Sequence, residues 1–128
     1  YLFSYTSFAF KKSIEWINSD KEFIKRAGFV LMAQLSVHDK NAENEVFEHF
    51  LKLIYEKSDD NRNYVKKAVN WALRQIGKRS IFLNKSALET AENILLKGDK
   101  ASKWIARDAL RELKNEKVVS QLSAKNNK

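Results

Sequence analysis

The chain has no cysteine and no proline, and only three of its 128 residues are glycine. Without cysteine it can form neither disulfide bonds nor thiolate zinc sites, a composition typical of the reducing cytoplasm. Proline and glycine are the residues that interrupt helices, so their scarcity predicts an all-α protein. No run of about eighteen apolar residues occurs, so the sequence predicts no membrane-spanning helix. We therefore expect a helical, cytoplasmic protein.

Positive charge is concentrated in the second half of the chain. The net charge is +8, yet residues 1–59 hold eight Lys or Arg against nine Asp or Glu, a balance of −1. Residues 60–128 hold sixteen against seven, a balance of +9. Such an asymmetry indicates a basic surface on the C-terminal part of the fold, and hence an anionic partner.

Residues 61–79 are the most informative segment, with six Lys or Arg and no acidic residue. At helical spacing they form two stripes. The first is apolar and explains folding; it comprises Val65, Ala68, Val69, Ala72, Leu73 and Ile76. The second is cationic and includes a large aromatic residue; it comprises Lys67, Asn70, Trp71, Arg74 and Lys78. A cationic stripe with an aromatic ring indicates an anionic polymer as partner, with nucleic acid first among the possibilities.

Caps and breakers predict six helices joined by short polar loops. Ser19 and Glu22 have the spacing of a capping box at the start of the second helix, and Gly77 is the expected C-cap of the fourth. A tail from Asn115 is expected to add a short turn before fraying at residues 125–128. The predicted helices cover residues 7–17, 20–37, 42–57, 61–77, 84–96 and 100–114.

The helices also repeat. Residues 23–27 (FIKRA) lie 41 residues before 64–68 (YVKKA), and residues 72–76 (ALRQI) lie 37 residues before 109–113 (ALREL). A helix-pair period near ~40 is typical of HEAT-type solenoids. We therefore expect residues 1–128 to form one domain of about three HEAT-like helix pairs, arranged as a curved α-solenoid. A compact bundle without repeats is the alternative.

In such a solenoid the second helix of each pair lines the concave surface. The outward stripes would then combine Arg26, Phe29 and Val30 with the stripe of residues 67–78 and with Trp104, Arg107, Asp108 and Arg111. Cations suit phosphates, and flat rings suit bases or sugars. In the alternative interpretation, Trp71 and Trp104 pack into neighbouring helices and the cations are merely solvated.

Residues 61–80 (NRNYVKKAVNWALRQIGKRS) and 103–113 (KWIARDALREL) closely resemble the DNA alkylation repair family, the HEAT-like-repeat DNA glycosylases. Residues 21–40 and 47–60 support the resemblance, which extends over essentially the whole chain. It implies a curved stack of helix pairs that holds duplex DNA in a basic groove. It also implies hydrolysis of the N-glycosidic bond of N-alkylated purines such as 3-methyladenine and 7-methylguanine, with no metal or organic cofactor.

The resemblance assigns roles to individual residues. Arg26 matches the family's arginine at the DNA groove, Trp71 matches the tryptophan of its active-site cleft, and Lys66, Lys67 and Arg74 match its groove cations. Together with the outward stripes, these residues give a predicted DNA-binding set: Arg26, Lys66, Lys67, Asn70, Trp71, Arg74, Lys78, Trp104, Arg107 and Arg111.

The family's catalytic aspartate has no counterpart in the chain. It lies in a Trp-Asp motif upstream of the segment that corresponds to residues 1–3, and no Trp-Asp pair occurs here. Asp108 does not match that position and is expected to pair with Arg107 or Arg111. The chain thus resembles the C-terminal part of a longer enzyme. We expect it to bind double-stranded DNA weakly, as a monomer, and not to excise bases by itself.

Other chemistry is less well supported. His38 and His49 have no metal-ligand spacing, and both are expected at the surface. No glycine-rich phosphate loop or nucleophile motif occurs. The alternative to an incomplete glycosylase is a HEAT-type scaffold that binds nucleic acid or protein without chemistry. A basic bundle with no nucleic-acid role is a third possibility.

Overall fold

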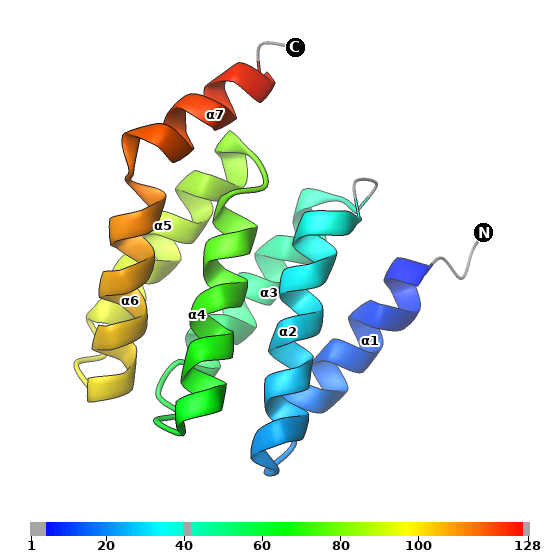
Figure 1. The fold of residues 1–128 in the computed structure, drawn as a ribbon. Coiled ribbons are helices and arrows are strands. Elements are labelled where there is room, and N and C mark those ends of the chain that lie inside the picture. The colour runs from blue at the N-terminus through cyan, green and yellow to red at the C-terminus, as the bar shows by residue number, and fades with distance from the viewer. Residues whose placement is uncertain (1–4, 40–41, 127–128) are drawn as a thin grey trace.

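The structure, a computed structural model, describes residues 5–39 and 42–126 and is helical throughout that part of the chain (Figure 1). The all-α prediction is therefore confirmed for the described residues. Residues 1–4, 40–41 and 127–128, which include parts of a predicted loop and of the tail, lie outside them. The helices are α1 Tyr5–Ile17, α2 Glu22–His38, α3 Asn44–Lys57, α4 Asn63–Gly77, α5 Ile81–Leu95, α6 Lys100–Leu113 and α7 Glu116–Asn126.

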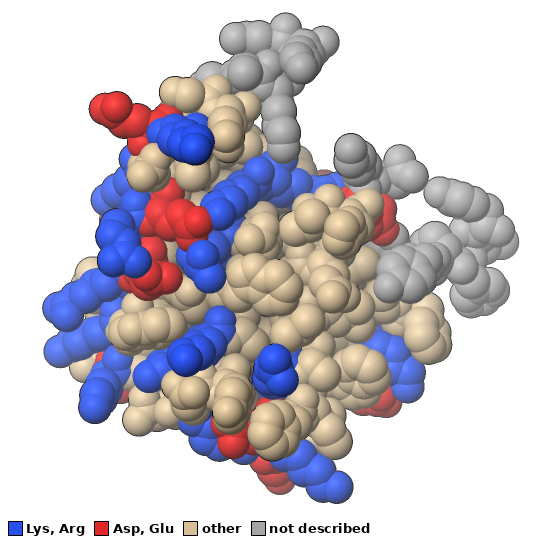
Figure 2. Space-filling view, in the orientation of Figure 1, with Lys and Arg blue, Asp and Glu red and all other residues tan. Residues whose placement is uncertain are grey.

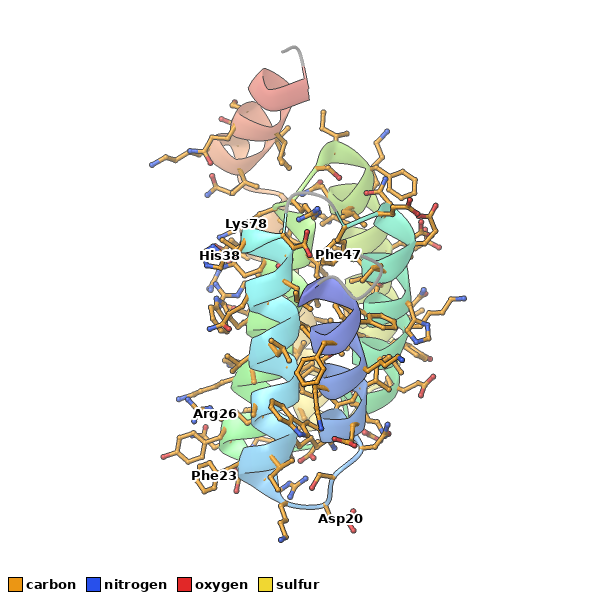
Figure 3. All side chains as sticks on the ribbon, turned by 90° about the vertical axis from the view of Figure 1, so that its right-hand side faces the viewer. Asp20, Phe23, Arg26, His38, Phe47 and Lys78 are labelled. Atoms are coloured by element: carbon orange, nitrogen blue, oxygen red, sulfur yellow. The ribbon has the colours of Figure 1, made fainter. Side chains whose placement is uncertain are left out.

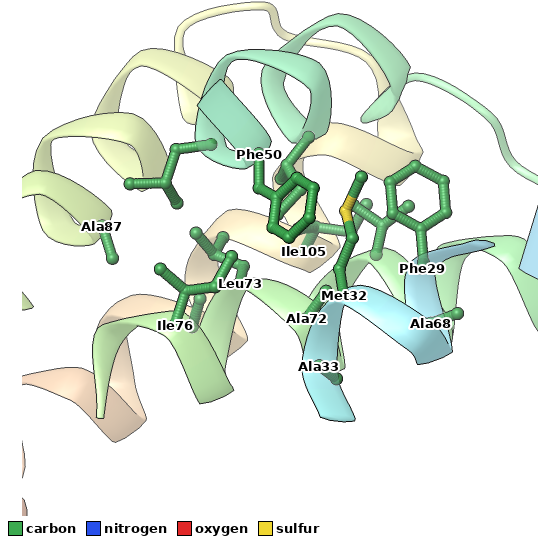
Figure 4. Packing of buried hydrophobic residues seen from close by; sticks show 14 of the residues in the cluster. Phe29, Met32, Ala33, Phe50, Ala68, Ala72, Leu73, Ile76, Ala87 and Ile105 are labelled. Carbon is green, nitrogen blue, oxygen red and sulfur yellow. The ribbon is translucent and has the colours of Figure 1, made fainter. Parts of the chain in front are cut away.

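The helices form two layers. Helices α2, α4 and α6 lie side by side at the front of Figure 1, and α1, α3 and α5 lie behind them. The apolar stripes of both layers meet between them, as Figure 4 shows for Phe29 and Met32 of α2, Phe50 of α3 and Leu73 of α4. All four side chains are fully buried. Each layer therefore has one inner face in the core and one outer face toward solvent.

Hydrogen bonds between successive helix pairs recur at a nearly constant separation along the sequence. The guanidinium of Arg62 donates to the carbonyl of Asp20, and Nζ of Lys97 donates to the carbonyl of Tyr55; both separations are 42 residues. The hydroxyl of Ser102 donates to the carbonyl of Ser58, 44 residues away. The separations agree with the period near ~40 that the sequence predicts. The continuation of these pairs into a curved HEAT-like solenoid stays a prediction, as does the single 1–128 domain.

Several helix ends differ from the sequence-based predictions by one to three residues. The capping box at Ser19 and Glu22 was wrong: the Ser19 hydroxyl accepts from the amide of Lys21, and the Glu22 carboxylate accepts from the amide of Tyr64. Helix α5 begins three residues earlier than expected because Ser80 caps it. The Ser80 hydroxyl accepts from the amide of Leu83 at 3.2 Å.

Gly77 ends α4, but not as a left-handed cap. The following residue, Lys78, has φ −95°, and the only described glycine with a positive φ is Gly98, at 82°. Gly77 is instead buried against Leu113 and Ala87, where an added Cβ would lie 2.7 Å from a Leu113 methyl carbon. The tail forms a full helix, α7, where a short turn was expected, and Leu122 anchors it with 4% of its surface exposed.

Gly28 lets α2 cross α1 at close range. A Cβ at this position would lie 2.8 Å from both the backbone nitrogen of Ile17 and the carbonyl oxygen of Ser13. These are backbone atoms of α1, so a small side-chain movement cannot relieve the clash. The close approach holds the two helices of the first pair together, and so fixes α2, which carries Arg26, against α1.

We expect Gly28→Ala to lower the free energy of unfolding by about 1–3 kcal/mol, the usual cost of overpacking. This sign is opposite to that of helix propensity, which favours alanine by about 1 kcal/mol. Urea denaturation measures the change. The control is Gln34→Ala, at an exposed position of the same helix, which should stay within about 0.5 kcal/mol of the wild type. A Gly28→Ala variant more stable than the wild type would contradict the close crossing.

Candidate nucleic-acid interface

The outer face of α2, α4 and α6 carries nine of the ten residues of the predicted DNA-binding set, and the tenth, Asn70, lies beneath it. We call it the inner-groove face, after its expected place in a solenoid. Figure 2 shows this face, with Lys and Arg gathered on the left over α4 and α6 and a largely uncharged surface over α2. In the side view of Figure 3, Phe23, Arg26 and Lys78 all project to the same side. The predicted cations of different helices thus share one surface.

The members of the predicted set differ in exposure. Five are exposed: Arg26, Lys67, Trp104, Arg107 and Arg111. Four are half-buried: Lys66, Trp71, Arg74 and Lys78. Asn70 is buried, with only 2% of its surface exposed. Trp71 packs against the core with part of its surface, so the alternative interpretation of this residue is partly right.

Asn70 lies beneath the face rather than on it. Its amide nitrogen donates to the carbonyl of Ile105 at 3.1 Å, and its amide oxygen accepts from Nε of Arg74 at 2.8 Å. It therefore ties α4 to α6 and orients Arg74. The prediction that Phe29 belongs to the outward stripe of α2 was wrong. Phe29 is fully buried in the core, so its ring is not exposed on the face.

Two carboxylates of α6 engage three of the predicted cations. Glu112 pairs with Arg74 at 2.6 Å and also with Lys78. Asp108 pairs with Arg111, as the sequence predicted, and lies 3.7 Å from Nε of Arg74. Burial acts to raise the pKa of Glu112, but hydrogen bonds from Lys78 and Arg74 outweigh it and hold the pKa below its usual value. Glu112 is therefore ionised at neutral pH and partly neutralises this end of the face.

The remaining predicted cations form no ion pair within the part of the chain that the structure describes; they are Arg26, Lys66, Lys67 and Arg107. Two of them contact aromatic rings instead. The guanidinium of Arg26 lies 5.7 Å from the ring centroid of Tyr64, and Nζ of Lys66 lies 5.1 Å from that of Trp104. Unpaired cations on one surface repel one another and favour an anion across from them.

Other basic residues of the segment 61–79 have structural roles. The guanidinium of Arg79 donates to the carbonyls of Ser36 and Ala42, both at 3.0 Å, and lies over the ring of Phe47. Burial lowers the pKa of Arg79, although the nearby Asp39 acts in the opposite direction. Arg79 therefore clamps the α2–α3 connection and is not part of the face. A count of charges along the sequence cannot separate these two uses of arginine.

The sequence analysis also missed residues that the fold brings to the face. Phe23 and Tyr64 are 62% and 48% exposed, and their ring centroids lie 5.4 Å apart next to Arg26.

Lys100 and Lys103 join Lys66, Trp104, Arg107, Asp108 and Arg111 around a shallow hollow of about 530 Å³. Residues 100, 103, 104, 107 and 111 follow helical spacing, so extending the outward stripe of α6 by one turn would have identified both lysines.

A charged network at one end of the face holds α2 and α4 together. Nζ of Lys25 donates to Asp60 at 2.7 Å, and the guanidinium of Arg62 donates to both carboxylate oxygens of Asp60. The Arg62 hydrogen bond is the main reason that the pKa of Asp60 lies well below its usual range; burial opposes it and the Lys25 hydrogen bond adds to it. This network fixes the helix starts that present Arg26 and Tyr64.

Within residues 5–39 and 42–126, no group of three or more His, Cys, Asp or Glu could hold a metal ion, and both histidines are exposed. No helix among those residues is long and apolar enough to cross a membrane.

Comparison with known proteins identifies a family. Residues 5–113 match the family described as DNA alkylation repair enzyme, which covers most of the chain and all ten residues of the predicted set. Curated proteins and solved structures gave no match. The family that the sequence was found to resemble is thereby confirmed.

We expect Asp60→Asn to lower the free energy of unfolding by about 1–3 kcal/mol at pH 7, the usual range for losing charge-assisted hydrogen bonds. Because the pKa of Asp60 is depressed in the folded state, its stabilisation is complete above the unfolded pKa of about 3.9. It is lost as the pH falls from there toward the folded pKa. The difference between wild type and variant should therefore shrink between pH 5 and pH 2.5, as measured by urea denaturation.

Asp59→Asn is the matched control, because Asp59 is the exposed neighbour and forms no ion pair among the described residues. It should leave stability nearly unchanged at both ends of the pH range. A difference between wild type and Asp60→Asn that stays constant with pH would contradict the ionic role of Asp60.

Proposed function

The chain belongs to the DNA alkylation repair enzyme family, and from this premise we propose that its inner-groove face binds duplex DNA during the excision of N-alkylated purines. The observation that supports the proposal most directly is a set of cations that form no ion pair with any described residue: Arg26, Lys66, Lys67 and Arg107. They come from α2, α4 and α6, three neighbouring helices, and all four are exposed or half-buried there. A duplex offers phosphates at regular spacing, and each cation that neutralises one releases a counterion.

The charge of the opposite layer supports the same orientation. Helix α3 exposes Glu45, Glu48 and Glu56, which would repel the phosphate backbone. DNA is therefore expected on the α2, α4 and α6 side alone. On that side lie Trp71 and Arg26, which the sequence resemblance matches to the family's cleft tryptophan and groove arginine.

The chemistry itself needs a carboxylate with uncompensated charge. An N-alkylated purine is already cationic and leaves readily, so the enzyme's task is to stabilise the positive sugar and position water. The two carboxylates of α6, Asp108 and Glu112, each neutralise nearby cations. Their charge is largely compensated, so neither is suited to this role. We therefore propose that the inner-groove face contributes DNA binding, and that none of its residues cleaves the glycosidic bond.

We expect duplex DNA to bind with a log–log salt slope near −4.5 if the face neutralises about five phosphates. Lys67→Gln should make that slope less steep by about 0.9, because one phosphate contact is lost. Fluorescence anisotropy across a series of salt concentrations measures both slopes. Lys52→Gln is the matched control: it removes the same charge from an exposed position of α3, in the other layer, and should leave the slope unchanged. Equal effects of the two variants would refute the assignment of the face.

We further expect this 128-residue chain to bind methylated DNA but to release 7-methylguanine from it no faster than the uncatalysed reaction. Chromatography of the released bases makes the measurement. Release by the wild-type chain that Asp108→Asn abolishes would show that Asp108 is catalytic despite its ion pair, and would contradict the expectation.

A further inference from the structure

The hollow on α6, the Trp104 hollow, is strongly positively charged. Five cations line it, together with Trp104 and a single acid, Asp108, which pairs with Arg111. The other four cations form no ion pair within the described ranges; they are Lys66, Lys100, Lys103 and Arg107. Its volume, about 530 Å³, is in the usual range for pockets that hold one small ligand.

Trp104 is the most exposed tryptophan of the chain. With 40% of its surface exposed, it differs from Trp16 and Trp71, which are half-buried. Lys66 reaches across from α4 to within 5.1 Å of the centroid of the Trp104 ring and ties the ring to the neighbouring helix. An indole held in this way between cations offers a flat apolar surface within a positive field. The ligand that matches both properties has a flat ring and carries negative charge.

A nucleotide has both properties, but only an unpaired one can use them. In a duplex each base is already stacked on its neighbours, so a side chain outside the helix meets only backbone and groove edges. An unpaired base can lie against an aromatic ring while its phosphates stay near the cations, as in proteins that bind single strands. We propose that the Trp104 hollow binds an unpaired nucleotide of the DNA, adjacent to the duplex held by the rest of the face. This inference rests on the proposed duplex binding.

The test compares three DNA ligands that share one duplex. The first has blunt ends, the second a single-stranded overhang of three thymidines, and the third an overhang of three abasic sites with the same number of phosphates. The wild type should bind the thymidine overhang about tenfold more tightly than the abasic overhang, within the range that stacking of one base supplies. The abasic overhang isolates the contribution of the base, because charge is matched.

Trp104→Ala should reduce that ratio to about one, because the unpaired base loses the ring on which it stacks. Trp104→Phe keeps a smaller ring and should retain part of the preference. The matched control is Phe82→Ala, which removes a ring that is 49% exposed from α5, outside the hollow, and should change none of the three affinities. Circular dichroism and urea denaturation verify that each variant is folded.

The outcomes separate the two proposals. If the wild type binds blunt duplex but does not distinguish thymidine from abasic overhangs, the inference is overturned and duplex binding stands. If folded Trp104→Ala weakens all three ligands equally, the ring contacts duplex or supports the fold, and the inference is overturned again. If no ligand binds even at low salt, both proposals fail.

Discussion

Burial of the apolar stripe of α4 is the constraint on which the other features depend. Helix α4 contacts α2, α3, α5 and α6, so it lies at the centre of the fold. Val65, Val69, Leu73 and Ile76 are fully buried, and each such side chain contributes about 1.5–3 kcal/mol relative to exposure. This burial fixes the rotation of α4 about its own axis. Lys67 is thereby held toward solvent, and Arg74 is held at the edge of the face.

The same logic applies to the helices on either side of α4. Helix α6 turns Ile105, Ala106 and Ala109 into the core, and α2 turns Phe29 and Met32 inward. Arg107 and Arg26 are left on the side of their helices that faces the same solvent as Lys67. Electrostatic attraction is not what brings these cations to one surface. Packing of the apolar stripes gathers like charges, and their mutual repulsion is a cost that a bound polyanion would relieve.

The acids of α6 divide this surface into two functional parts. Glu112 and Asp108 hold Arg74, Lys78 and Arg111 in ion pairs, which have to be broken or shared before those cations can contact a phosphate. Lys67 and Arg107 need no such exchange. The free-energy cost of contacting a phosphate is therefore higher for the ion-paired cations than for the unpaired ones, although all of these cations lie at helical spacing.

Much of the fold could be read from helical periodicity. The two stripes of residues 61–79 predicted both the buried side of α4 and most of its exposed side, and the offsets of 41 and 37 residues predicted helix pairs. Helix ends were predicted less accurately. Serine is a plausible N-cap by composition at both position 19 and position 80, but only Ser80 caps the helix that follows it, and the local backbone decides this. Periodicity also placed Phe29 on the wrong side of α2, since a wide apolar stripe has no sharp edge in sequence.

The sequence by itself determined that the chain is helical, that its second half is basic, and which family it belongs to, because composition, 3.6-residue periodicity and local motifs are properties of the chain alone. Only the tertiary structure decided which charges meet. Arg79 donates to the carbonyls of Ser36 and Ala42, 43 and 37 residues away, and Arg74 reaches Glu112 across 38 residues. Lys66 meets Trp104 between two helices. Such pairs depend on how the helices are rotated and stacked, and the buried stripes fix that arrangement only when all the helices pack together.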